Sequence, residues 1–153
     1  MKLNFFLSLI LFISLLLRIF HIGSIPGSLY GDEQAFAYNA YSILTTGMDE
    51  YGIKYPLEFR SFDDYKAPIP VYLLVPIIKI FGLNAFAIRL PVVIFAVLTV
   101  LVFYFLLKTF FSSKISLVAA FLLAVSPWHM HLSRGYFEAT ISLFFFTGWI
   151  LFF

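Results

Sequence analysis

The sequence predicts an all-α, polytopic integral membrane protein, and its composition carries this prediction. Of the 153 residues, 62% are hydrophobic and only 12% are charged, which is far from the composition of a water-soluble domain. Phe (21 residues) and Tyr (9 residues) are abundant, as expected of lipid-facing and interfacial surfaces. The net charge of +2 is too small to indicate nucleic-acid binding, and the absence of Cys excludes disulfides and thiolate chemistry.

Four apolar segments are predicted to cross the membrane, for which about 20 residues each suffice. The first comprises residues 3–22, and we interpret it as an uncleaved span because no small-residue cleavage site follows it. The other three are residues 88–107, 115–128 and 140–153. The chain stops inside the last apolar run, so we expect it to be the N-terminal part of a longer protein.

The segment KAPIPVYLLVPIIKIFG, residues 66–82, is expected to form an interfacial or re-entrant helix rather than a fifth span. Prolines and Lys79 interrupt it, and its apolar part is shorter than a spanning helix. Two complete spans then separate residues 23–87 from residues 129–139. Both connecting regions would therefore lie on the same face of the membrane.

Charged residues segregate in agreement with this topology. The face of the membrane opposite the two connecting regions would hold only three charged residues, Lys2, Lys108 and Lys114. Four basic residues in the long loop would place it in the cytoplasm by the positive-inside rule, but the rule weakens for loops beyond about 60 residues. Charge alone thus leaves the orientation open. The two connecting regions contain every acidic residue of the chain: Asp32, Glu33, Asp49, Glu50, Glu58, Asp63, Asp64 and Glu138.

Two adjacent carboxylates, Asp32 and Glu33, stand at the start of a predicted amphipathic helix that ends near Thr46 and Gly47. One interpretation is structural: Asp32 caps the helix, and Glu33 complements the helix dipole. The other is functional: a carboxylate at the membrane surface takes a proton from an acceptor hydroxyl or amine, or holds a metal ion. Both interpretations are open at this point.

Lys66 is a second candidate, because it precedes a proline-stiffened helix start that would fix its ammonium at the headgroup level. A fixed cation there suits a phosphate group. The alternative is a lysine that snorkels to the interface or pairs with Asp63 or Asp64.

The third candidate region is SPWHMHLSRGYFE, residues 126–138. Glu138 stands at the mouth of an apolar helix, where an ionised group needs a partner or a role. His129 and His131 have incomplete spacing for a metal site, so we favour interfacial packing for both. Trp128 is interpreted as an interface anchor.

The order of the motifs GDE, YKAPIPVYL, FGLNAFAIRLP and SPWHMHLSRGYFEA resembles the N-terminal part of the GT-C membrane glycosyltransferases. The closest similarity is to the glycosyltransferase family 39 type, which includes protein O-mannosyltransferases and lipid A aminoarabinose transferases. The resemblance covers essentially all 153 residues. It implies a GT-C-like transmembrane module whose first outer loop carries interfacial helices and faces the periplasm or cell exterior. Lys66 is followed by Ala-Pro, where Pro-Pro is commoner in the family.

The resemblance also implies roles for particular residues. The family's donor is a sugar on a polyprenyl phosphate, and the acidic pair of its first outer loop matches Asp32 and Glu33, with Asp32 as the catalytic position. No organic cofactor is expected, and a divalent cation is left open. Glu138 matches the acidic residue of the second outer loop, and the candidates for contact with the lipid phosphate are Lys66, Arg60 and Arg134.

We therefore expect a membrane glycosyltransferase that moves a sugar from a polyprenyl-phosphate donor to a protein, lipid or glycan acceptor at the outer face. One alternative is a transporter or flippase for lipid-linked sugars, which should carry ionisable residues deep within its spans. The other is a non-catalytic subunit of a membrane complex, in which the loop acids would be dispensable.

Overall fold

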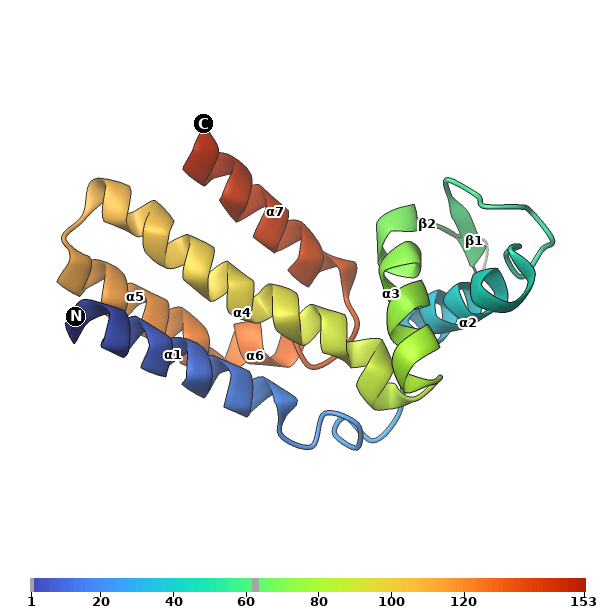
Figure 1. Ribbon diagram of the computed structural model, residues 1–153, viewed down its shortest axis with the longest axis horizontal. Helices are drawn as coiled ribbons and strands as arrows, with labels where there is room; N and C mark the ends of the chain where they lie inside the picture. Colours follow the sequence, from blue (N-terminus) through green and yellow to red (C-terminus); the bar gives the residue numbers. More distant parts are fainter. Residues whose placement is uncertain (1, 62–63) are drawn as a thin grey trace.

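The computed structural model describes residues 2–61 and 64–153, and in these residues it contains seven helices and one two-stranded antiparallel sheet (Figure 1). The prediction of an all-α chain therefore omitted a short hairpin. In chain order the elements are α1 (Lys2–Ile19), α2 (Gly31–Thr46), β1 (Phe59–Ser61), β2 (Asp64–Lys66), α3 (Pro68–Phe81), α4 (Ala85–Phe110), α5 (Ser113–Val125), α6 (Pro127–Leu132) and α7 (Glu138–Phe152).

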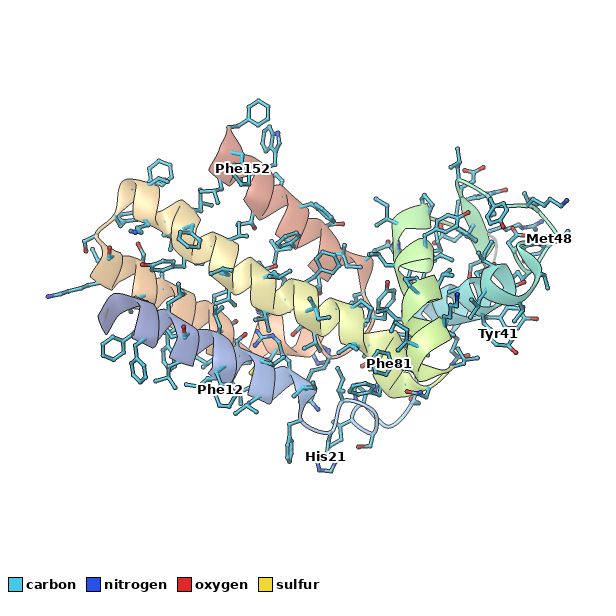
Figure 2. The ribbon with its side chains drawn as sticks, viewed as in Figure 1. Phe12, His21, Tyr41, Met48, Phe81 and Phe152 are labelled. Atoms are coloured by element: carbon cyan, nitrogen blue, oxygen red, sulfur yellow. The ribbon has the colours of Figure 1, made fainter. Side chains whose placement is uncertain are left out.

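A bundle of long apolar helices forms one part of the molecule. α4 packs against α1, α5 and α7, and α1 also packs against α5. Small side chains allow close approach at the α4–α5 contact, where Ala120 and Ala124 are fully buried beside Val100. Many large apolar side chains stay exposed on the outside, among them Phe12 of α1 and Phe152 of α7 (Figure 2). An apolar exterior of this kind suits lipid rather than water.

Helix length distinguishes α4 from its neighbours. α4 has 26 residues, about 39 Å at 1.5 Å per residue, and among the described helices it alone is long and apolar enough to cross a membrane by length and composition. α1 ends at Ile19, before the end of the predicted span of residues 3–22. α5 ends at Val125, and α6 starts at Pro127, a residue that suits a first helical turn and cannot donate a hydrogen bond to α5. The four-span topology stays a prediction.

α3 is inclined steeply to α4 instead of running beside it (Figure 1). Its 14 residues extend about 21 Å, which is less than the roughly 30 Å of a hydrocarbon core. α3 begins at Pro68, where the missing N–H costs nothing, and ends at Gly82 with φ of 76°. This geometry agrees with a helix that does not span.

The second part of the molecule lies at one end of the bundle. There α2, β1 and α3 share a core with the first turns of α4 and α7, formed by residues such as Phe36, Phe59, Leu74, Ile88 and Ile141. Residues 20–61 and 64–84 lie at this end with the connection from α6 to α7, whereas the α4–α5 turn lies at the other (Figure 1). The location of both connecting regions on one face of the membrane stays a prediction.

Labelling of single cysteines tests this topology, and the chain has no natural Cys to interfere. We expect Glu58→Cys and His131→Cys, both exposed, to react with an impermeant maleimide from the same side of the membrane. Ser112→Cys, exposed in the α4–α5 turn, should react only from the opposite side. Reaction of positions 58 and 131 from opposite sides would show that α3 crosses the membrane.

Candidate functional site

Asp32 and Lys66 form an ion pair at the junction of α2 and the hairpin. Lys66 Nζ lies 3.0 Å from Asp32 Oδ1 and 2.6 Å from Asp64 Oδ2. The antiparallel register Ser61↔Asp64 and Phe59↔Lys66 holds Lys66 at the end of β2, immediately before α3. The predicted pairing of Lys66 with Asp64 is confirmed, whereas Asp63 lies outside the described residues.

Lys66 and Asp64 stabilise each other's charged form. Hydrogen bonding from Lys66 and from the Tyr65 backbone, together with the lysine charge, lowers the pKa of Asp64 below its usual value. Hydrogen bonds to Asp64 and then to Asp32 raise the pKa of Lys66. The Lys66–Asp64 attraction is therefore present at neutral pH and is lost only as pH falls through the lowered pKa of Asp64 or rises through the raised pKa of Lys66.

Asp32 is not the N-cap of α2, so the structural interpretation of this residue was wrong. The N-cap is Tyr30, and its backbone N–H donates to Glu33 Oε2 at 2.9 Å. Asp32 is the second residue of the helix, and its side chain is 51% exposed. Its carboxylate is thus free of a capping bond and open to solvent beside a lysine. The predicted C-terminus is confirmed, because Gly47 ends α2 with φ of 73°.

Glu33 has the opposite environment, since it is completely buried. Its Oε1 accepts from Arg89 Nε at 2.9 Å and from the Tyr136 backbone N–H at 2.8 Å. Its Oε2 accepts from Arg89 Nη2 at 3.1 Å and from the Tyr30 N–H. Both oxygens of Glu33 are occupied, which favours Asp32 as the carboxylate that a substrate can reach.

Arg89, in the second turn of α4, is also completely buried, and all five of its N–H groups have acceptors. Besides its bonds to Glu33, it donates to the carbonyls of Ile22, Pro26 and Ser28 at 2.9–3.0 Å. One guanidinium therefore ties the α1–α2 connection to α2 and α4. Through Glu33, the same network reaches the segment before α7.

The other predicted phosphate ligands lie elsewhere. Arg60, on β1, places its guanidinium 5.5 Å from the ring centre of Tyr51. Arg134 donates to the carbonyls of Leu17 and Phe20 at 2.9 and 2.8 Å, which satisfies the end of α1. The bonds of Arg134 are structural, and the contact of Arg60 with Tyr51 does not involve Lys66.

Glu138 is exposed at the first position of α7, where a negative charge is favourable to the helix dipole. Within residues 2–61 and 64–153 its carboxylate has no hydrogen bond or ion pair. It lies at the same end of the bundle as Asp32 (Figure 1). Its assignment as a catalytic residue stays a prediction.

His129 and His131 have separate environments. His129 is buried, and its Nδ1 accepts from Arg18 Nη2 at 2.7 Å. Burial and then the charge of Arg18 lower the pKa of His129 to about 4, so the ring is neutral at physiological pH. His131 is exposed. In the described part of the chain, no three His, Asp or Glu side chains gather as metal ligands would.

Sequence reasoning missed the two residues that organise this end of the molecule, Arg89 and Tyr136. Tyr136 is buried, donates its hydroxyl to the Pro70 carbonyl at 2.7 Å and packs edge-on against Phe36. A signal for Arg89 was present, because an arginine at the head of an apolar span requires a partner. Nothing in the local pattern indicated Tyr136.

The fold and the charged cluster define a helical protein with an apolar exterior and an ionic site at one end of its bundle, as a membrane enzyme with a lipid-linked substrate would have. A family model described as dolichyl-phosphate-mannose-protein mannosyltransferase matches residues 65–153, more than half of the chain. The chain belongs to this family of membrane glycosyltransferases. No curated protein and no solved structure matches it significantly.

The matched residues include Lys66, Arg89 and Glu138 but not Asp32 and Glu33. The assignment of the acidic pair therefore rests on the resemblance described above and on its contacts. Those contacts connect it to the matched region three times, through Asp32–Lys66, Glu33–Arg89 and Glu33–Tyr136.

A double-mutant cycle tests the buried pair. Glu33→Gln leaves the Arg89 charge without a counter-charge, and Arg89→Met leaves the Glu33 charge unpaired, so each should destabilise the protein by about 3–5 kcal/mol. The double variant should lose less than the sum, as measured by unfolding of the purified protein in detergent. Additive losses would show that the two charges do not depend on each other.

Proposed function

We propose that the protein transfers a glycosyl group from a polyprenyl-phosphate-linked sugar to an acceptor at the outer face of the membrane, with Asp32 and Lys66 at the reaction centre. The observation that carries this proposal is the 3.0 Å contact between Asp32 and Lys66 at the loop end of the bundle. A solvent-open carboxylate and a lysine ammonium in contact are the base and the cation that this reaction needs.

Lys66 would bind the phosphate of the donor. Its side chain is only 14% exposed, so the ammonium is held in place rather than moving freely in solvent. An apolar groove of about 360 Å³ starts two residues later, along α3. A lipid whose phosphate meets Lys66 could place its first isoprene units there. The lining residues of the groove are Leu57, Pro68, Ile69, Tyr72, Leu73 and Pro76.

Asp32 would accept the proton of the acceptor hydroxyl as its oxygen attacks the anomeric carbon. The bond from that carbon to the phosphate oxygen then breaks, and the polyprenyl phosphate leaves with the electron pair. Lys66 would stabilise the charge that develops on the leaving phosphate. Asp32 and Lys66 are in contact, so a phosphate that binds Lys66 would also bring the anomeric carbon near Asp32.

The transporter alternative predicts ionisable groups deep within the spans. The buried arginines, Arg18 and Arg89, lie instead toward the loop end of α1 and α4. Arg89 is neutralised by Glu33, and Arg18 donates to Ser14, Ala124 and His129. These are structural bonds, which favours the enzyme over a transporter.

The variant Asp32→Asn, in the full-length, reconstituted protein, tests whether Asp32 contributes to catalysis or only to stability. Asp32 is half exposed and does not cap α2, so the variant should insert and unfold like the parent. An amide cannot act as a base, so transfer from the lipid-linked donor should slow at least about 100-fold. Transfer near the parental rate would favour the non-catalytic subunit or move the base to Glu138.

Lys66→Ala and Asp64→Asn should change donor use in opposite directions. Lys66→Ala removes the cation and should raise KM for the donor. Asp64→Asn removes the closest competitor for Lys66 and should lower that KM with kcat unchanged, because Asp64 is exposed and is not proposed to touch the sugar. Steady-state kinetics at varied donor concentration would show this. Equal donor KM in both variants and the parent would contradict phosphate binding at Lys66.

A further inference from the structure

A second cavity is lined by none of the three residues of the Lys66 cluster. It has a volume of about 620 Å³ and lies between α2, Leu29, the residues before β1 and the turn from α3 to α4. α2 contributes Gln34, Ala35, Ala37 and Tyr38 to it. The cavity is of the size of small-molecule sites, roughly 300–1,000 Å³.

The polar side chains of this cavity have unused hydrogen-bonding capacity. Ser61 is 97% buried on β1, and its hydroxyl has no hydrogen-bond partner among residues 2–61 and 64–153. Glu50 uses Oε1 to accept from Asn39, and Gln34 uses Nε2 to donate to Leu29. Within the same residues, Glu50 Oε2, Gln34 Oε1 and the Tyr38 and Tyr51 hydroxyls are without partners. The Ser61 hydroxyl lines the cavity, where a ligand group or a water molecule can bond to it.

Two half-exposed aromatic rings accompany these groups. Tyr38 is 56% exposed and Tyr51 is 54% exposed, and both line the cavity. The Arg60 guanidinium lies 5.5 Å from the ring centre of Tyr51. An exposed tyrosine offers a flat apolar surface together with a hydroxyl.

The charge of the lining disfavours an anionic ligand. Among the described residues that line the cavity, Glu50 is the one carboxylate and there is no lysine or arginine, although Arg60 lies against Tyr51. A phosphate would therefore prefer Lys66, which does not line the cavity. A pyranose ring fits the cavity's groups, because its C–H face packs on an aromatic ring while its hydroxyls donate to carboxylate and amide oxygens and accept from hydroxyls.

We propose that this cavity is a binding site for a neutral saccharide, separate from the Asp32–Lys66 pair. A pyranose would pack against Tyr38 and hydrogen-bond to Ser61, Glu50 and Gln34. The site does not depend on the proposed transfer reaction. Lys66 suits a phosphate, and the cavity beside Tyr38 suits an uncharged, hydroxyl-rich group.

The test is saturation-transfer NMR of methyl α-mannopyranoside with the full-length protein in nanodiscs. We expect saturation of the ring C–H protons and a millimolar affinity. Ser61→Ala removes only the hydroxyl and should weaken binding about 5-fold, the effect of about one hydrogen bond. Tyr38→Ala should weaken it at least as much. Tyr41→Ala is the matched control, because Tyr41 is exposed on the same helix (Figure 2) but does not line the cavity.

Further variants and probes in the same experiment distinguish this site from the proposed reaction centre. Asp32→Asn and Lys66→Ala should bind the sugar like the parent even where transfer is lost. Absence of saturation transfer at tens of millimolar sugar would overturn the proposal, as would equal binding by the parent, Ser61→Ala and Tyr38→Ala. Two other probes, an uncharged serine-containing peptide and the cationic sugar glucosamine, should bind more weakly than the neutral sugar; stronger binding of either would also overturn it.

Discussion

The buried ion pair of Glu33 and Arg89 is the interaction on which the loop end of this protein depends. Glu33 accepts four hydrogen bonds, and Arg89 donates five. They connect the α1–α2 linker, α2, α4 and the segment before α7, which are far apart in the chain. Two charges taken out of water are stable together only when such bonds are complete. The pair therefore fixes the position of α2, and α2 carries Asp32.

Consecutive residues of an α-helix point about 100° apart, and this spacing gives the two adjacent acids different environments. Because Glu33 is directed into the core by Arg89, Asp32 is directed to the surface. There it meets Lys66, which the hairpin and the proline at the start of α3 hold in place. The position of Asp32 thus depends on contacts of its neighbours, namely those of Glu33 with Arg89 and those that hold Lys66.

Much of this arrangement could be predicted from sequence. Hydrophobic periodicity located α2, and its C-terminus at Gly47 agrees with the structure; the prolines and short apolar length of residues 66–82 predicted a helix that does not span. The cap was mispredicted because Asp is a common N-cap, but Glu33 reaches back to the Tyr30 N–H instead. The partners of Glu33 could not be predicted, since they lie up to 103 positions away in the chain. The hairpin is local, with Phe59 opposite Lys66, but its strands of three residues are too short to show an alternating pattern.

The charges at the loop end bear on how the two proposed ligands could be kept apart. Lys66 supplies the cation that an anionic lipid head requires, while the described lining of the cavity beside Ser61 has Glu50 and no lysine or arginine. Under the two proposals above, a phosphate is attracted to Lys66 and disfavoured in the cavity. α2 contributes both Asp32 and Tyr38, so the buried pair of Glu33 and Arg89, which fixes α2, also fixes these two residues relative to the rest of the loop end.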